Sequence, residues 1–357
     1  MTCEVMNIKK LLAVGIILLL FTGMTLTSAI TADKPTFSKT IYVDDDNVDG
    51  PWDGSQEHPY QYIQDAVDNA SNWDTVFVYN GIYSDFSPDN YACVKITKSI
   101  NLIGEDKHNT IINGTKHIIR VTSNNVTVSN FTLRSTEKKD TNGWGFDLQG
   151  HNDIIIKNNI IKNKYYGFLI FVGKNIHIYN NQIINNWKGI EIQKNSFINV
   201  DNNLISNNGI GIEKVGNSCT FEKNYIHNNR IGITITYGNK NNISNNEFRN
   251  NEIGLEACDD SESSISYNNF INNSKHATIN KRGTIFESVF YITSKNKWFR
   301  NYWHNWFHLI PRPIIGIWVI TLRLFPSPMT IPIAIFPYIE TDWHPAQEPY
   351  DIPAGGA

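Results

Sequence analysis

The stretch Asn159-Ile-Ile-Lys-Asn163, followed by Gly167, is the first of a series of near copies that decides the fold. The later copies are Asn181–Asn185 with Gly189, Asn203–Asn207 with Gly211, Asn224–Asn228 with Gly232, and Asn246–Asn250 with Gly254. Successive glycines are 21 or 22 residues apart, and a last copy, Asn268–Asn272, has His276 where the glycine stood. A fixed period near 22 residues indicates a solenoid. Leucine-rich repeats share this period, but their leucine signature is absent.

Each repeat contains three short runs in which apolar residues alternate with others. In the first repeat the runs are Phe168–Ile170, Ile176–Ile178 and the residues around Ile183. Alternation with a period of two predicts strands that send every second side chain inward. Asn and Gly between the runs suit turns that need a positive φ. We therefore predict an all-β parallel β-helix with three-strand rungs of about 22 residues, in which equivalent Asn side chains form a ladder.

The two ends of the chain differ from the repeats. Residues Tyr62–Ser71 carry one apolar helical face (Ile63, Ala66, Val67 and Ala70), which predicts a helix that caps the solenoid. After residue 297 the chain holds nine of its 13 prolines and five of its nine tryptophans. We interpret this Pro/Trp-rich segment as a C-terminal cap, with membrane-surface contact as the alternative. Pro326, Pro328, Pro332 and Pro337 are expected to break regular structure.

The N-terminus predicts export. Lys9 and Lys10 precede an apolar run from Leu11 to Phe21, and Thr27-Ser28-Ala29 resembles a cleavage site. Retention as an anchor is the alternative. We divide the chain into a signal peptide (1–29), a tether (30–39), an N-terminal cap with the first rungs (40–104), the β-helix (105–296) and the C-terminal capping segment (297–357). The formal net charge of −3 argues against nucleic-acid binding, and we expect a monomer.

The repeat period aligns a column of side chains on the outer face of one sheet. The column comprises Asp147, Leu169, Glu191, Glu213, Thr234 and Glu256. Neighbouring carboxylates about 5 Å apart repel unless one is protonated or a cation lies between them. Asp147, Glu191, Glu213 and Glu256 are therefore candidate catalytic acids and bases, or calcium ligands. The alternative is a polar exterior whose acids are neutralised by Lys188, and we expect no Arg in this column.

Two further groups of residues are candidates for binding. Tyr165, Tyr166 and Trp187 precede two of the outer strands and could stack on sugars. Asp44, Asp46 and Asp49 alternate before Gly50 and could bind calcium. Their spacing does not complete an EF-hand, so a solvated turn is the alternative.

Several segments resemble known families. Ile41–Asp46, Asn80–Tyr83 and Ser99–Gly104 resemble the opening of secreted pectin-lyase-like β-helix proteins. The repeats resemble those of NosD-like extracytoplasmic proteins, and the ending Asn301-Tyr-Trp303 with Asp342–Pro345 resembles a group of archaeal surface proteins. The resemblance implies export and right-handed winding, which parallel crossovers generally prefer. It also implies copper handling, although Met is scarce and only His304 and His308 are spaced as a ligand pair would be.

Three functional hypotheses follow. The first is an exported structural or carbohydrate-binding protein of the cell surface or periplasm, whose partner is a polysaccharide or surface glycan. The second is a polysaccharide-active enzyme (lyase, hydrolase or epimerase) that uses the acidic column. The third is a copper-handling accessory protein.

Overall fold

A computed structural model describes residues 38–84, 91–135, 143–194, 197–284, 295–307, 309–323, 330–353 and 355. The chain separates into two compact units, residues 1–37 and residues 38–357. The predicted signal peptide lies in the first unit, outside the described residues. Pro326, Pro328 and His308 belong to the second unit but also lie outside the described residues. The second unit is described below by itself.

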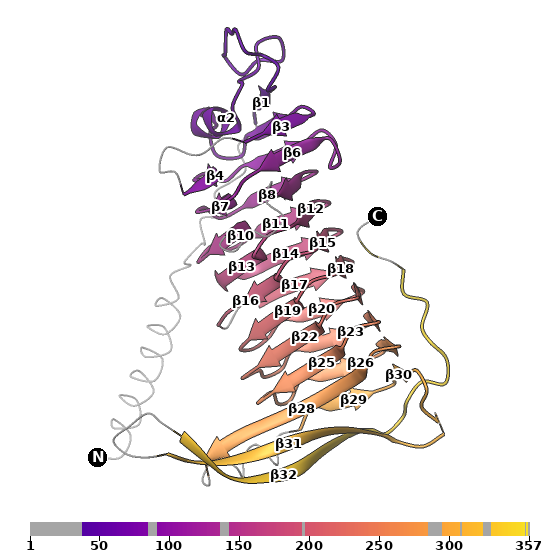
Figure 1. Cartoon of the computed structure of the whole chain (residues 1–357). Helices are drawn as coiled ribbons and strands as arrows, with labels where there is room; N and C mark the ends of the chain where they lie inside the picture. Colours follow the sequence, from indigo (N-terminus) through magenta and orange to yellow (C-terminus); the bar gives the residue numbers. More distant parts are fainter. Residues whose placement is uncertain are drawn as a thin grey trace, which may run out of the picture. The chain divides into compact units, whose positions relative to one another are not determined.

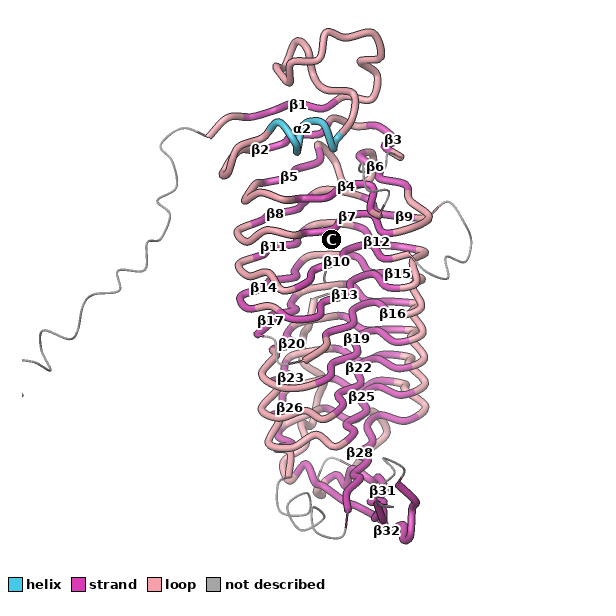
Figure 2. The backbone as a smooth tube through the Cα atoms, turned by 90° about the vertical axis from the view of Figure 1, so that its left-hand side faces the viewer, coloured by secondary structure: helices cyan, strands magenta, loops and turns pink. Residues whose placement is uncertain are grey.

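Three sheets run the length of the second unit, and their strands follow one another around each turn (Figures 1 and 2). Sheet A contains β1 (Thr40–Val43), β2 (Thr75–Val78), β5 (Asn101–Gly104), β8 (Val126–Ser129), β11 (Ile154–Lys157), β14 (Lys174–Tyr179), β17 (Phe197–Asp201), β20 (Thr220–Glu222), β23 (Asn242–Ser244), β26 (Ser264–Ser266) and β29 (Lys297–Phe299). Sheet B contains β3 (Gly81–Tyr83), β6 (Thr110–Asn113), β9 (Thr132–Arg134), β12 (Ile160–Lys162), β15 (Gln182–Ile184), β18 (Leu204–Ser206), β21 (Tyr225–His227), β24 (Glu247–Arg249), β27 (Asn269–Ile271) and β30 (Tyr302–Trp303). Sheet C contains β4 (Ala92–Ile96), β7 (His117–Val121), β10 (Trp144–Gln149), β13 (Tyr166–Val172), β16 (Lys188–Ile192), β19 (Ile210–Val215), β22 (Ile231–Thr236), β25 (Ile253–Cys258), β28 (Lys275–Thr284), β31 (Arg312–Arg323) and β32 (Thr330–Asp342).

The strand register confirms the parallel β-helix. Phe146 pairs with Phe168, and Phe168 pairs with Ile190, one repeat apart each time. The sequence predicts an insertion at one turn, because the similar runs Val126–Val128 and Ile154–Ile156 are 28 residues apart, and Ile154 does pair with Val126. The predicted tip of that insertion, Glu137–Asp140, lies outside the described residues.

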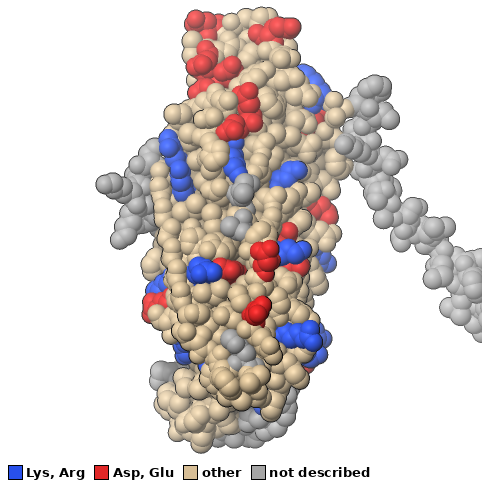
Figure 3. Space-filling model, turned by 90° about the vertical axis from the view of Figure 1, so that its right-hand side faces the viewer, with Lys and Arg blue, Asp and Glu red and all other residues tan. Residues whose placement is uncertain are grey.

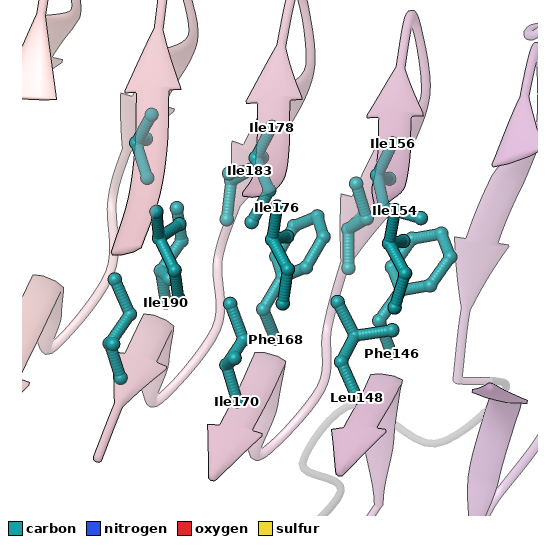
Figure 4. Close-up of a cluster of buried hydrophobic side chains, with 14 of the residues drawn as sticks. Phe146, Leu148, Ile154, Ile156, Phe168, Ile170, Ile176, Ile178, Ile183 and Ile190 are labelled. Atoms are coloured by element: carbon teal, nitrogen blue, oxygen red, sulfur yellow. The ribbon is translucent and has the colours of Figure 1, made fainter. Parts of the chain in front are cut away.

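The core is a stack of identical positions. Figure 4 shows Phe146 beside Phe168 and Ile154 beside Ile176, each pair at equivalent places in successive turns. The two phenylalanine rings stack with centroids 4.9 Å apart, and all four side chains are at most 1% exposed. Each such side chain contributes roughly 1.5–3 kcal/mol by leaving water, so the repeated inward positions carry most of the stability.

Asn-Asn pairs at the corners explain the recurring phrase. The first residue of a pair, such as Asn202 (φ 52°), adopts the left-handed conformation, which Asn tolerates better than most residues. The second residue, such as Asn203, is fully buried and joins the predicted ladder. Asn181 Nδ2 donates to Asn203 Oδ1 (3.1 Å), and Asn203 Nδ2 donates to Asn224 Oδ1 (3.0 Å). The ladder prediction is therefore confirmed.

A second ladder, which the sequence interpretation missed, runs along the next corner. Its members are Asn186, Asn208, Asn229, Asn251 and Asn273. Each one follows an Asn with positive φ, as in the first ladder. The Asn-Asn pairs that form this second ladder were thus visible in the sequence, five residues after the first-ladder Asn in each repeat.

The helix α2 (Ile63–Asn69) is shorter than the predicted Tyr62–Ser71. Its residues Ile63, Ala66 and Val67 are buried in the same core as the strands. That it serves as a cap stays a prediction.

The C-terminal segment corrects one expectation. Strand β32 passes through Pro332 and Pro337 without ending, because it is the last strand of sheet C and a proline is tolerated where its missing N–H faces no partner. At its end, Asp342 Oδ2 accepts hydrogen bonds from Asn301 N and Nδ2, both 3.0 Å away. A carboxylate thus takes the place that the next ladder Asn would occupy.

Candidate functional site

The predicted column lies on the outer face of sheet C. The register pairs Asp147 with Leu169, Leu169 with Glu191, and Glu191 with Glu213. It continues through Thr234 to Glu256. The repeat from Gly211 to Gly232 is one residue shorter than its neighbours, so the sequence leaves the facing of Glu213 and Lys214 open. In the structure Lys214 points inward between Ile192 and Ile235 and is fully buried.

Lys188 holds the two central carboxylates together. Its Nζ lies 2.7 Å from Glu191 Oε2 and 2.6 Å from Glu213 Oε2. Burial works to lower the pKa of Lys188, but its hydrogen bonds to Glu191 and Glu213 outweigh that effect and raise it. Gln193 Nε2 also donates to Glu191. One protein cation therefore bridges both acids and offsets part of their charge, which favours the alternative that the sequence left open.

Glu256 lies two strands further along the sheet. Thr234 Oγ1 and Asn280 Nδ2 each lie 3.4 Å from one of its carboxylate oxygens. Burial, followed by the charge of Glu256, raises the pKa of the neighbouring Cys258 thiol to about 11. The thiol is therefore protonated near neutral pH, and this end of the column carries neutral donors.

The six residues of the predicted column include no Arg, but the column continues before Asp147 and contains one there. Arg120 pairs with Asp147 in the register, and Lys95 pairs with Arg120. The interpretation missed both residues because it applied the 22-residue period from Gly145 onward, whereas the preceding turn is longer. The longer step from Val126 to Ile154 was visible in the sequence and would have located them.

Asp147 is the most deeply buried acid of this face, at 0% exposure. Its Oδ2 lies 3.5 Å from both Arg120 Nε and the Tyr91 hydroxyl. Among the described residues its Oδ1 has no hydrogen-bond partner. Burial raises the pKa of Asp147, although Gln149, Arg120 and Tyr91 oppose the shift. Burial therefore inclines this carboxyl to hold a proton.

A row of aromatic rings adjoins Asp147. His117 lies between Tyr91 and Trp144, with ring centroids 4.5 and 4.0 Å away. Trp144 is 6.2 Å from Tyr166, and Arg120 lies 4.3 Å above the Tyr91 ring. These residues come from successive strands of sheet C or directly precede one, so the row follows the solenoid axis.

The predicted aromatic residues extend this row. Tyr165 and Tyr166 are in contact, with centroids 4.7 Å apart. Tyr165 stacks nearly parallel to Trp187, at 6.4 Å and 11°. Tyr165 and Tyr166 are half-buried, whereas Trp187 is 53% exposed. The structure thus brings the three together, and it adds Tyr91, His117 and Trp144 to them.

A second polar surface lies on sheet A. It is a shallow hollow of about 460 Å³, lined by Asn125, Thr127, Asp153, Ile155, Asn175, Ile176, His177 and Asn199. His177 is paired with Asp201. The described residues that line this hollow include no Phe, Tyr or Trp, so we regard it as the weaker candidate.

The acidic loop lies at the end of the solenoid where β1 begins. Figure 3 shows acidic side chains gathered at that end, whereas acids and bases are interspersed over the rest of the face. Asp44 Oδ1 accepts a hydrogen bond from Asp46 N (3.1 Å), and Asp49 is exposed. Across the described ranges, no three His, Cys, Asp or Glu side chains form a group that could hold a metal ion. Calcium at Asp44, Asp46 and Asp49 stays a prediction.

The fold and this face define a parallel β-helix protein with a polar and aromatic outer surface. Residues 67–213 and 137–306 match the family described as Periplasmic copper-binding protein (NosD). The two matches together cover more than half of the chain, and the chain belongs to this family. The family description also indicates an extracytoplasmic location. No curated protein matches the sequence.

Solved structures resemble the chain in fold alone. The A-module of mannuronan C-5 epimerase AlgE4 from Azotobacter vinelandii is 14% identical, with a TM-score of 0.47 over 68% of this chain and 81% of that chain. A rhamnogalacturonan lyase is 13% identical, with a TM-score of 0.45 over 68% of this chain and 84% of that chain. Pectin methylesterase PemA from Erwinia chrysanthemi is 13% identical, with a TM-score of 0.35 over 68% and 81%.

The described residues do not fit the copper that the family description implies. Copper favours grouped His, Cys or Met ligands. All four methionines lie outside the described residues, and Cys93 and Cys219 are buried. The described histidines join no group of three potential ligands. In the predicted His304 pair, His308 lies outside the described residues. No step of the function proposed below therefore involves copper.

Proposed function

We propose that this protein acts outside the cytoplasm as a carbohydrate-binding β-helix. A polysaccharide would lie along the outer face of sheet C, over strands β4 to β16. The observation that carries the proposal is the continuous aromatic row beside Arg120 and Asp147.

The row has the chemistry that a sugar chain requires. The C–H faces of sugar rings pack against aromatic rings, and aromatic side chains combine large contact areas with few freely rotating bonds. Arg120, whose side chain is 27% exposed, supplies donors for hydroxyl groups, and the fully buried Asp147 contacts its guanidinium. Because the rings follow the solenoid axis, an extended chain would contact several of them at once.

The central part of the column favours binding over turnover. Lys188 contacts both Glu191 and Glu213, so neither carboxylate is available to act as an unpaired acid or base. Lys188 also lies 5.3 Å from the Tyr166 ring centroid, which links this ion pair to the aromatic row. The ion pairs of Lys188 therefore suit a structural role, in which they help to hold Tyr166 in place.

The test is a glycan-array screen of residues 38–357, run with calcium and again with a chelator, followed by product analysis on every hit. We expect binding to extended polysaccharides without cleavage. Binding only to free monosaccharides, or to no glycan, would contradict the proposal. Loss of binding with chelator would transfer the role to the acidic loop around Asp44, Asp46 and Asp49.

A polysaccharide-active enzyme is the second candidate. It is favoured by one observation, the buried Asp147 with its raised pKa beside Tyr91 and Arg120. A protonated carboxyl and a guanidinium could donate a proton and stabilise negative charge during sugar chemistry. New reducing ends, unsaturated products or epimerised sugars that disappear in Asp147→Asn would establish this activity.

A further inference from the structure

The end of the solenoid carries an apolar hairpin that the carbohydrate site does not use. Strands β31 and β32 pair antiparallel, from Arg312 with Asp342 to Arg323 with Thr330. Figure 1 shows the two strands at the end of the solenoid opposite β1, extending across it. From Ile314 to Leu322 and from Ile331 to Ile339 the sequence contains no charged residue.

Only part of the hairpin closes the core. Ile314 and Tyr338 are buried in the main hydrophobic cluster. A second set of large apolar side chains remains exposed, comprising Ile315, Ile317, Leu322, Ile331, Ile333, Ile335, Phe336 and Ile339. By the strand register Ile315, Ile317, Ile335 and Ile339 share one face of the hairpin, and an exposed apolar face of this kind indicates a binding surface.

The edge of the hairpin is unsuited to adding another strand. Strand β32 is the outermost strand of sheet C, and it contains Pro332 and Pro337. Prolines on an edge strand interrupt the row of backbone donors that a second strand would need. The side chains, rather than the edge, are therefore the surface that a partner would cover.

The charges around the hairpin point to an anionic partner. The described acids on β32 face inward: Glu340 accepts from Trp298 Nε1 (2.6 Å), and Asp342 accepts from Trp303 Nε1 (3.2 Å). Both carboxylates are at most 2% exposed. In contrast, the bases Lys295, Lys297, Arg300 and Arg282 are exposed. The tail after β32 also exposes the acids Glu348 and Asp351, but Lys295 and Lys297 line a hollow with Trp343 at the end of β32, so positive charge adjoins the apolar hairpin there.

We infer that the β31–β32 hairpin docks on the surface of a membrane that contains anionic phospholipids. Its exposed apolar side chains would enter the boundary between headgroups and acyl chains, and the exposed bases would contact headgroup phosphates. Trp343, 67% exposed beside the hairpin, suits the headgroup level. The hairpin lies at the interface and does not cross, because its edge backbone groups would be unsatisfied in hydrocarbon.

Vesicle flotation tests this inference. Residues 38–357 are the suitable chain, because they form a compact unit and omit the apolar run Leu11–Phe21, which would bind lipid by itself. We expect flotation with vesicles of equal parts phosphatidylglycerol and phosphatidylcholine, and much less with phosphatidylcholine alone. About 0.5 M salt should weaken the binding by screening the headgroup charges.

Matched variants make the result specific. The double variant Ile335→Ser/Phe336→Ser removes side chains that are 64% and 46% exposed and should reduce lipid binding at least about tenfold. The control Ile82→Ser/Phe197→Ser alters side chains that are 55% and 54% exposed and lie elsewhere, and it should bind as the parent does. Circular dichroism should show that both variants are folded.

Three results would overturn the inference. The first is equal flotation of the hairpin variant and the control, and the second is no flotation of the parent chain. The third is a dimer in sedimentation experiments without lipid that the hairpin variant abolishes, which would assign the surface to a second copy. Charge-removing substitution of Lys295, Lys297 and Arg300 by Gln should abolish the preference for phosphatidylglycerol.

Discussion

The two halves of the outer face of sheet C share one register but differ in how their charged groups are paired. Over β16 and β19, Lys188 bridges Glu191 and Glu213, with its Nζ within 2.7 Å of an oxygen of each. Over β7 and β10, Arg120 lies 3.5 Å from a fully buried Asp147, and one carboxylate oxygen there has no partner among the described residues. Aromatic rings border this second pair. The comparison teaches that a column of acids is by itself a poor sign of a site; a row of aromatic rings beside the charged pair is a better one.

The largest effect on glycan binding is expected when the central ring of the aromatic row is removed. Trp144→Ala should weaken glycan binding about 30-fold or more, equivalent to about 2 kcal/mol, because Trp144 bridges His117 and Tyr166. Isothermal titration calorimetry with an array hit measures the change. Tyr237→Ala, which removes an exposed ring beyond β22, is the matched control and should bind normally. Equal losses of glycan affinity in Trp144→Ala and Tyr237→Ala would show that the half with the aromatic row is not the preferred binding surface.

The second prediction concerns the half of the face over β16 and β19, where Lys188 contacts two carboxylates. Lys188→Met should lower the free energy of unfolding by about 2 kcal/mol, because two neighbouring carboxylates would lose their shared cation; the partial exposure of the group keeps the effect below that of a fully buried pair. Urea denaturation gives the value. The triple variant Lys188→Met/Glu191→Gln/Glu213→Gln should recover most of it. A stable single variant would show that the ion pairs are unimportant.

The third prediction concerns the pH dependence of stability that Asp147 causes in the half of the face over β7 and β10. Because burial raises the pKa of Asp147, the folded state holds the proton more tightly than the unfolded state. Stability should therefore fall as the pH rises from about 4, the unfolded value, through the higher folded value. Asp147→Asn should flatten this part of a plot of Tm against pH. Glu213→Gln is the comparison variant, and the same flattening there would contradict the assignment to Asp147.

The smallest expected effect is that of metal removal. A chelator should leave glycan binding unchanged, because no metal-ligand group of three side chains occurs in the described part of the chain. Titration of calcium into residues 38–357 tests the acidic loop separately. Heat that disappears in Asp44→Asn/Asp46→Asn would support the calcium prediction for that loop, without changing the account of sheet C.

The fold was predictable because every repeat shows both the alternation that forms strands and the residues that form turns. Period-two alternation places Phe168 and Ile170 inward, and the Asn-Asn pairs supply both a left-handed turn and a ladder amide, as at Asn202 and Asn203. The helix around Val67 was predictable from its apolar face, but its ends were not. Prolines were misleading in β32, because their effect depends on whether a strand has a neighbour on that side.

The candidate site was only partly predictable. The period located Glu191, Glu213 and Asp147 on one face, but it could not say which acids a lysine would neutralise. Arg120 was missed because an insertion lengthens the turn before Asp147. The burial of Asp147 depends on neighbouring turns, and a repeat pattern contains no information about such contacts.

Footprinting of the bound glycan tests the central claim most directly. Hydroxyl-radical labelling of residues 38–357, with and without an array hit, compares the reactivity of ring side chains along sheet C. The account predicts strong protection of Trp144, Tyr166 and Tyr91, with Tyr237 unchanged. Protection confined to the residues beyond β19, or to the His177 hollow on sheet A, would contradict it.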